Sequence, residues 1–366
     1  MKTKNKPPMK TTEELMREIP ESDIWTYRIE GLQEPQINRD HSHSAGKKAA
    51  TVISLLVAIS LSIFFSVRAV HTKTYKFGEN DDGTYELIKF SNPGNMSGID
   101  IDFANGDETK PITVIHEYAF NCDDKLETIR IGKDVKEIDG KSFYSCEKLQ
   151  AFSVDENNEY FCDLDGVLYT KDLSEVICYP IGRDQYLRDK FGYEKELTNE
   201  DDGYEAYEKD VLTYRLPEQV KKIGKLSFNY AKIADIYLPE GLETIETMAF
   251  FKSVTLKNVI TVGKDGEYPS LPEGLLYIGS DAFSYDQGLG YVYIPSSVTF
   301  IGHHAFWDTV YKQSGELAGV TAICVAADKD TFKEQVHTGD QWKPEYDYML
   351  FKKAVEVLYS SERESS

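Results

Sequence analysis

The chain has 366 residues, 41% of them hydrophobic, which is enough for one extended domain or about two compact ones with a substantial core. Its 41 Lys and Arg are outnumbered by 62 Asp and Glu. This balance excludes nucleic acid and anionic membrane surfaces as the main ligand, because phosphate binding depends on clustered cations. The five cysteines are too few and odd in number for a disulfide framework, and no C-x-x-C pair indicates a zinc site.

Residues 49–67, AATVISLLVAISLSIFFSV, contain no charged side chain and match the ~20 apolar residues that a helix needs to cross a bilayer. The alternative is a signal peptide cleaved after Ala69, but a signal has a shorter apolar region and a shorter stretch before it. We therefore expect one transmembrane helix at 49–67, preceded by a flexible tail at 1–48. Basic residues flank the span on both sides, so the positive-inside rule does not decide its orientation.

A six-residue pattern of Ile, three variable residues, Ala or Ser, and Phe occurs six times after the span. The copies are IHEYAF at 115, IDGKSF at 138, IGKLSF at 223, IETMAF at 245, IGSDAF at 278 and IGHHAF at 301. Three of the five steps are 22 or 23 residues, and insertions lengthen the other two to 33 and 85. This period is typical of a solenoid, in which coils too short to bury their own apolar face are stabilised by stacking. Each coil is expected to hold one strand and one short helix or turn.

The recurring isoleucine and phenylalanine are the predicted core of the repeat. They are Ile115, Phe120, Ile138, Phe143, Ile223, Phe228, Ile245, Phe250, Ile278, Phe283, Ile301 and Phe306. The copies also serve as an internal control for possible metal or thiol chemistry around His116 and Cys122. The position of His116 is filled by Asp139, Gly224 and other residues in the remaining copies, so the stretch is interpreted as scaffold.

Other candidate sites have simpler explanations. His303 and His304 occupy variable positions of the last copy, where a solvated surface is expected rather than a metal site. The acidic stretch NEDDG at 199–203 lacks the remaining ligands of an EF-hand loop. The sequence therefore predicts no catalytic residue, no metal site and no cofactor.

The repeated pattern resembles the BspA-like leucine-rich repeat surface proteins, whose coils read approximately IPxxVxxIGxxAFxxCxxLxxI. The resemblance extends from about residue 71 to 345 and implies an α/β repeat fold, a right-handed solenoid with coils of 22–23 residues. It implies an N-terminal cap hairpin at 71–110 and repeats at 111–320, with a hairpin around DGVLY and an acidic insertion within 155–210. Residues 321–366 are the expected C-terminal cap and tail.

The same resemblance implies a non-catalytic cell-surface protein whose repeat domain is extracellular, whose N-terminus is cytoplasmic and whose ligand is a protein or a glycan. The alternative is a single-span signalling protein whose solenoid senses an external ligand while the tail binds a cytoplasmic partner.

Exposed tyrosine favours a binding surface, and many of the 24 tyrosines, including Tyr118, Tyr230 and Tyr285, occupy variable positions. The candidate binding residues are Tyr237, Tyr277, Tyr291 and Tyr293, although packing and strand propensity also favour tyrosine in a strand-rich repeat.

Overall fold

The computed structural model describes residues 75–92, 96–121, 123–313, 316–320, 322–343 and 356–360. It divides the chain into two units, Met1–Ala69 and Val70–Ser366, and every described residue lies in the second. The predicted tail at 1–48, the predicted transmembrane helix at 49–67 and Cys122 lie outside the described residues. Within these ranges there is no helix with the length and apolar content required to cross a bilayer.

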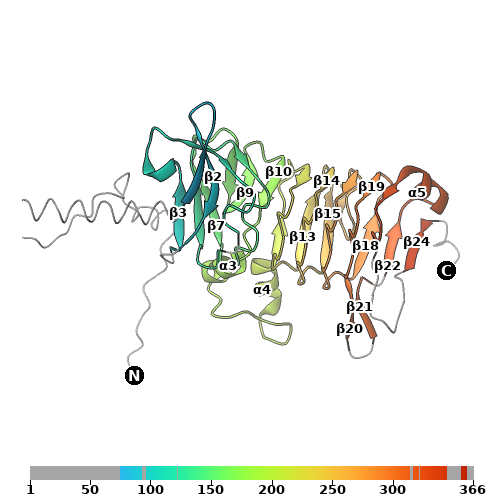
Figure 1. The fold of residues 1–366 in the computed structure, drawn as a ribbon. Coiled ribbons are helices and arrows are strands. Elements are labelled where there is room, and N and C mark those ends of the chain that lie inside the picture. The colour runs from blue at the N-terminus through green and yellow to red at the C-terminus, as the bar shows by residue number, and fades with distance from the viewer. Residues whose placement is uncertain are drawn as a thin grey trace, which may run out of the picture. The chain divides into compact units, whose positions relative to one another are not determined.

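The coils contribute strands to two separate series of parallel pairings, a longer strand in one series and a short strand, often of two residues, in the other (Figure 1). In the longer strands alternate side chains are buried, as in β13, where Ile236 and Leu238 face the core. The longer strands form three sheets, with the orders β3-β5-β7, β11-β13-β15-β16 and β18-β22-β24. Their bounds are β3 Gly98–Ile101, β5 Thr128–Ile131, β7 Ala151–Val154, β11 Thr213–Arg215, β13 Asp235–Pro239, β15 Asn258–Gly263, β16 Gly266–Tyr268, β18 Tyr291–Ile294, β22 Ala322–Val325 and β24 Glu356–Tyr359.

The second series contains the short strands that end on the repeated isoleucine, so that Ile245 pairs with Ile223 on one side and Ile278 on the other. Together with the hairpin β1-β2, the strands β8, β9 and β10, and β23, they form two sheets, with the orders β1-β2-β4-β6 and β23-β19-β17-β14-β12-β10-β9-β8. Their bounds are β1 Tyr75–Glu79, β2 Tyr85–Phe90, β4 Ile112–Ile115, β6 Glu137–Ile138, β8 Phe161–Leu164, β9 Val167–Thr170, β10 Glu175–Cys178, β12 Lys222–Ile223, β14 Thr244–Ile245, β17 Tyr277–Ile278, β19 Phe300–Ile301 and β23 His337–Thr338.

The remaining elements are insertions and end segments. Strands β1 and β2 form an antiparallel hairpin at the start of the described chain, and β8, β9 and β10 form an antiparallel meander. Helices α3 and α4 and the hairpin β20-β21 project below the strands in Figure 1, and α5 lies at the C-terminal end. Their bounds are η1 Ala104–Gly106, α3 Arg183–Phe191, α4 Tyr204–Val211, α5 Lys329–Gln335, β20 Val310–Gln313 and β21 Glu316–Gly319.

The repeated Ile-x-x-x-[Ala/Ser]-Phe segments are turns, not the short helices that the sequence also allowed. Residues three and seven positions after the isoleucine have left-handed backbone torsion angles in most coils. At the first position φ is 59° in both Leu226 and Met248, and at the second it is 55° in Tyr230 and 60° in Lys252. L-residues adopt this conformation singly and at a cost, so two such residues four positions apart rule out an α-helix.

Glycine follows the isoleucine in several coils because the backbones of neighbouring coils nearly touch there. A Cβ atom on Gly279 would lie 2.4 Å from the backbone nitrogen of Thr247, and one on Gly302 would lie 2.2 Å from that of Ser280. Neither glycine has a positive φ, so close approach is the constraint at these positions.

The predicted core residues lie inside the coils. Eleven of the twelve are at most 3% exposed, and Ile138 is half-buried because β6 lies at the edge of its sheet. Their phenylalanine rings form an inner phenylalanine ladder, with centroids 5.2 Å apart between Phe228 and Phe250 and 5.0 Å between Phe250 and Phe283. The planes of these pairs differ by only 16° and 9°. One ring per coil therefore stacks on the ring of the next coil.

A further rung lies in the 85-residue gap between the second and third copies. Val176 of β10 pairs with Ile223 of β12, and the Tyr179 ring stacks on Phe228 with centroids 5.2 Å apart. Tyr179 thus lies where the other coils have phenylalanine. The segment VICYP lacks the small residue followed by Phe, so the sequence pattern did not reveal this rung.

Candidate binding surface

The four candidate tyrosines lie on two different series of strands. Tyr237 is on β13, and its ring lies 4.1 Å from the Arg215 guanidinium, which also pairs with Glu267 at 2.6 Å. Tyr291 and Tyr293 are on β18, where Tyr291 is 47% exposed. Tyr277 is on the short strand β17. The structure therefore does not bring the four tyrosines into one surface.

Tyr277 belongs to a separate small stack. Its ring lies parallel to Phe300 with centroids 4.7 Å apart, and Phe300 in turn stacks on His337 at 5.5 Å. These residues occupy matching positions on β17, β19 and β23, directly before the core position of each short strand. Cross-strand packing accounts for this stack, in line with the structural explanation for tyrosine in strands.

A longer row of aromatic rings runs across the outside of the turns. We call it the outer aromatic ladder, and its rings are Tyr118, Tyr144, Tyr230, Phe251, Tyr285 and Trp307. Successive centroids are 5.2 to 6.4 Å apart, and successive planes are inclined by 64° to 88°. This edge-to-face arrangement is favoured by the quadrupoles of neighbouring rings. Tyr118 is 43% exposed and the other five side chains are half-buried, so the row faces solvent.

The rings of the outer aromatic ladder come from different positions of the repeat. Tyr144, Phe251 and Trp307 directly follow the repeated phenylalanine, whereas Tyr230 and Tyr285 come one residue later, in the left-handed position. An alignment on the repeat therefore places these rings in different columns. Tyr118, Tyr230 and Tyr285 stood out as variable-position tyrosines, but their common surface follows only from the conformation of the turns.

Lys252 lies in the middle of the outer aromatic ladder. Its ammonium is 5.3 to 5.4 Å from the ring centroids of Tyr230, Phe251 and Tyr285, within the range of cation–π attraction. It donates a hydrogen bond to the Tyr230 hydroxyl at 3.2 Å. This hydrogen bond is the main cause that raises the pKa of Lys252, so the side chain is cationic at neutral pH.

The two ends of the outer aromatic ladder also carry ionisable groups. Near the first ring, Lys141 lies 5.2 Å from the Tyr118 centroid and pairs with Glu117 at 2.8 Å. At the other end the His304 ring lies 5.2 Å from Trp307, and its Nε2 is 2.7 Å from Gln341. The ladder therefore continues as a polar, hydrogen-bonded edge at each end.

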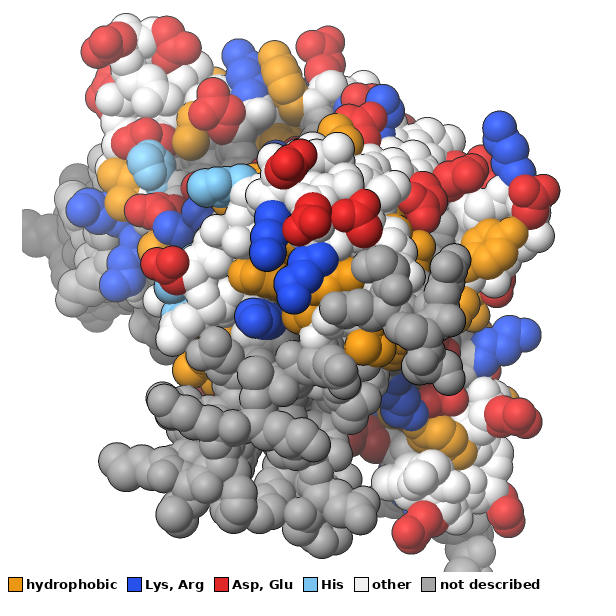
Figure 2. Space-filling view, turned by 90° about the vertical axis from the view of Figure 1, so that its right-hand side faces the viewer, with side chains coloured by type: hydrophobic (Ala, Val, Ile, Leu, Met, Phe, Trp, Pro, Cys, Tyr) orange, Lys and Arg blue, Asp and Glu red, His pale blue; other side chains and the backbone are white. Residues whose placement is uncertain are grey.

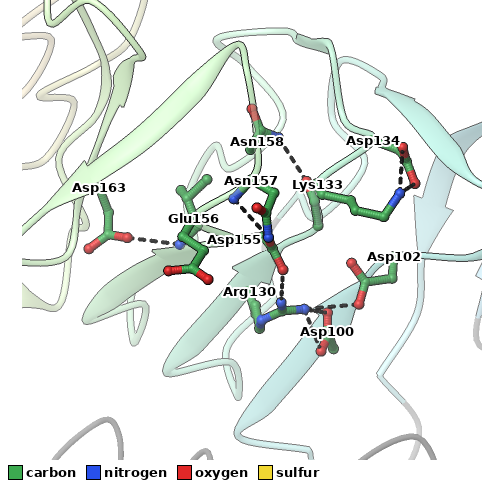
Figure 3. A network of polar contacts seen from close by, with 12 residues as sticks. Asp100, Asp102, Arg130, Lys133, Asp134, Asp155, Glu156, Asn157, Asn158 and Asp163 are labelled. Carbon is green, nitrogen blue, oxygen red and sulfur yellow. Dashed lines mark hydrogen bonds and ion pairs between the residues drawn. The ribbon is translucent and has the colours of Figure 1, made fainter.

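A network of carboxylates surrounds Arg130 on the outer face of β3 and β5 (Figure 3). The guanidinium binds Asp100 and Asp102, each at 2.9 Å, and also Asp155. Burial, followed by repulsion from Asp102, raises the pKa of Asp100 to about 6. Among the described residues no group of His, Cys, Asp and Glu has the arrangement of a metal site, so this network is best explained as a clamp between coils.

A cleft of about 280 Å³ lies between β6 of one short-strand sheet and the paired strands β10 and β12 of the other. Its charged lining includes Lys222, which lies between Glu175 at 3.3 Å and Glu246 at 3.4 Å. These charges compensate one another within the protein. Asp139 and Lys225 also line the cleft.

The histidines of the scaffold segments make ordinary polar contacts. His116 Nε2 lies 2.7 Å from a carboxylate oxygen of Glu86, and His304 Nδ1 lies 3.8 Å from Asp281.

Cys146 donates through Sγ to the backbone oxygen of Phe120 at 3.0 Å, a contact that Ser253 Oγ repeats with Phe228 at 2.6 Å. In the coil of Phe250, Ser253 therefore replaces the cysteine and keeps its hydrogen bond to the preceding coil.

Similar solved structures come from bacterial leucine-rich repeat proteins. The pneumococcal vaccine antigen PcpA is 19% identical, with 67% of each chain covered and a TM-score of 0.40. A leucine-rich repeat protein from Eubacterium ventriosum is 13% identical, with 79% of this chain and 92% of that chain covered and a TM-score of 0.43. A leucine-rich cell surface protein from Faecalibacterium prausnitzii is 16% identical, with 72% and 96% covered and a TM-score of 0.36.

No curated protein matches this chain. The family model described as the BspA type leucine rich repeat region matches six copies, over residues 90–175 and 208–313. These residues are more than half of the chain and contain all the turns that carry the outer aromatic ladder. The protein belongs to the BspA-type leucine-rich repeat family.

Proposed function

We propose that this protein is a non-catalytic cell-surface receptor or adhesin that binds an extracellular protein or glycan through its repeats. In this proposal residues 49–67 anchor the chain in the membrane, residues 1–48 lie in the cytoplasm and the repeat domain lies outside. The proposal keeps the expected boundaries, with the cap hairpin at 71–110, the repeats at 111–320 and the C-terminal cap and tail at 321–366. Family membership supports a binding role, and the apolar character of 49–67 supports the anchor.

The observation that carries the proposal is the outer aromatic ladder. Tyrosine and tryptophan dominate binding hot spots because each provides a large, rigid contact area with a polar edge. Six solvent-facing rings in a row exceed what coil stacking requires, since the inner phenylalanine ladder already fills the core. A continuous row of this kind suits an extended ligand that lies along several coils.

The test uses the full chain purified in detergent and applied to arrays of glycans and of extracellular proteins. The double variant Phe251→Ala and Tyr285→Ala removes two adjacent rings of the outer aromatic ladder, and Tyr268→Ala is the control because it removes an exposed ring elsewhere. We expect at least tenfold weaker binding in the double variant and unchanged binding in the control. Equal binding by all three proteins would exclude the outer aromatic ladder as the site.

The topology is tested on intact cells that express the full chain. Protease added from outside should remove residues 71–366 and leave residues 1–48 protected. Trimming of residues 1–48 alone would reverse the orientation and remove the basis for an external ligand.

A further inference from the structure

Lys252 is an uncompensated positive charge on a strongly acidic protein. The chain has a formal net charge of −21, and many of its described lysines and arginines pair with carboxylates, as Lys257 does with Glu208 at 2.6 Å. No carboxylate of the described residues pairs with Lys252. Its contacts are instead the Tyr230 hydroxyl and the rings of Tyr230, Phe251 and Tyr285.

The backbone places Lys252 on the rings at some conformational cost. Its φ of 60° lies in the left-handed region, where glycine or asparagine is favoured and other L-residues are strained. Its amide donates to Ser284 of the next coil at 3.0 Å, so the side chain is the part left to face solvent. The lysine is therefore held over the outer aromatic ladder by a fixed turn.

The same turn limits what kind of ligand can bind. The amides of Tyr230 and Tyr285 donate to Phe251 and Trp307 of the following coils at 3.0 and 2.9 Å. Peptides that add a strand to a sheet edge need free backbone donors and acceptors, and these amides are already used. Ring faces and one ammonium remain, which suits a ligand recognised by stacking of its C–H faces and by a single anionic group.

The sign and density of charge on the protein also limit how many anionic groups the ligand can carry. A densely sulfated or phosphorylated polymer needs several cations and would be repelled by the acidic surface. Figure 2 looks onto the end of the repeats where α5 lies and shows carboxylates spread among the Lys and Arg side chains there. Among the described cations that lie over the six rings, Lys141 pairs with Glu117 and Lys252 pairs with no carboxylate, which fits a chain of mostly neutral units with widely spaced carboxylates.

We propose that the outer aromatic ladder binds an extended polysaccharide that carries intermittent carboxylate groups, with its sugar faces stacked on the rings and one uronate-type carboxylate bound by Lys252. This inference rests on the proposed function and names the ligand class of the same surface. The ring-to-ring steps of 5.2 to 6.4 Å are comparable with the length of one pyranose unit, so an extended sugar chain can run along the row. Because successive planes are inclined by 64° to 88°, its sugars stack on the ring faces that point outward and contact the edges of the rings between them.

The test measures binding of the full chain in detergent to hyaluronan oligosaccharides by isothermal titration. Carboxyl-reduced hyaluronan, heparin and polyglutamate are the comparison probes. We expect hyaluronan to bind, carboxyl-reduced hyaluronan to bind about tenfold more weakly, and heparin and polyglutamate not to compete. Tighter binding of heparin or of polyglutamate than of hyaluronan would overturn the proposal, and so would equal binding of the native and reduced polymers.

Variants locate the carboxylate contact. Lys252→Gln should weaken hyaluronan binding about tenfold without changing the affinity for the reduced polymer, and Lys252→Arg should restore binding. Lys257→Gln is the matched control, because Lys257 lies 5.4 Å from the Tyr204 ring but is neutralised by Glu208. Equal losses in Lys252→Gln and Lys257→Gln would assign the effect to net charge and reject the specific contact.

The two proposals fail in different ways. If the chain binds a protein on the array through the outer aromatic ladder but no acidic glycan, the inference fails and the proposed function stands. If the Phe251→Ala and Tyr285→Ala double variant retains binding to every array ligand and to hyaluronan, both fail. Circular dichroism melting of each variant confirms that it is folded before binding is scored.

Discussion

The inner phenylalanine ladder and the outer aromatic ladder run along the same turns but obey different rules. The inner rings are at most 3% exposed, are nearly parallel from Phe228 to Phe306 and occupy one fixed position of the repeat. The outer rings face solvent, meet edge to face and come from different positions. Stacking of coils fixes the inner row, whereas the outer row varies in residue type and origin while remaining continuous. A surface preserved in this way is better explained by binding than by packing.

The largest expected effect is a difference in stability between alanine variants of two adjacent residues, one from each ladder. Phe250→Ala should destabilise the protein by about 3–5 kcal/mol, because it empties a fully buried position between two stacked rings. Phe251→Ala should cost less than about 1 kcal/mol, since that ring is half-buried and the turn survives without it. Urea unfolding of the full chain, followed through the circular dichroism of the strands, measures both. Similar losses in the two variants would show that the outer row is also structural.

Ion pairs, not rings, hold the outer face of the first long-strand sheet. Arg130→Ala should cost about 2 kcal/mol at pH 7, because Asp100, Asp102 and Asp155 lose their shared cation in a partly exposed site. The loss should be smaller at pH 5, where protonation relieves the repulsion among the three carboxylates.

The folded-state pKa of Asp100 is about 6, above its usual value of about 4, so the stability linked to Asp100 is present at low pH and is lost as the pH rises from about 4 to about 6. Unfolding curves at pH 5 and pH 7 decide the matter, and a pH-independent loss in Arg130→Ala would contradict the network as described.

The next effect is a gain in stability beside the inner phenylalanine ladder. Asp286 is fully buried, accepts one hydrogen bond from the Ser253 amide at 2.8 Å and has no partner for its other carboxyl oxygen among the described residues. Burial raises its pKa well above the usual value. Asp286→Ser places at this position the residue that Ser253 already provides one coil earlier. The expected gain is about 1–2 kcal/mol at pH 7.

This gain should shrink toward pH 4. The folded protein keeps the Asp286 proton while the unfolded chain releases it above about pH 4, so the wild type loses stability as the pH rises and the serine variant does not. Thermal unfolding at pH 4 and pH 7 tests the difference. A gain of the same size at both values would mean that packing, and not the buried carboxyl, is responsible.

Much of the fold follows from the sequence because stacking forces one apolar pattern on every coil. The isoleucines and phenylalanines of the six copies, including Ile223 and Phe228, form the core as predicted from their spacing. The rung at Val176 and Tyr179 was not predicted, because a valine and a tyrosine meet the same steric need without matching the pattern. Short helices were a possible element of each coil, but residues with left-handed backbone torsion angles exclude them. No local sequence motif predicts these residues.

The candidate site was less accessible from sequence than the fold. Tyr237, Tyr277, Tyr291 and Tyr293 were selected for their variable positions, yet position in the repeat does not say which strand face or turn a side chain shares with its neighbours. The outer aromatic ladder depends on turn geometry. The turns bring the residue seven positions after the isoleucine of one coil beside the residue six positions after the isoleucine of the next, as in Tyr230 and Phe251. Aligning aromatic residues over a two-residue window would have found five of its six rings, because Tyr118 comes earlier in the repeat, three positions after Ile115.

The smallest expected effect concerns the strain that these turns store. Ser145 has a φ of 57° in the same left-handed position as Tyr230 and Lys252, but it carries no ring of the outer aromatic ladder. Ser145→Gly should stabilise the protein by about 0.5 kcal/mol, because relief of the left-handed strain exceeds the extra backbone entropy of glycine in the unfolded chain. Ser153→Gly, in strand β7 without a positive φ, is the matched control and should destabilise by a similar amount. Opposite signs in thermal unfolding would place the strain in the turn. If both variants lose stability, the left-handed position costs little, and the turn carries its lysine and aromatic side chains without a conformational penalty.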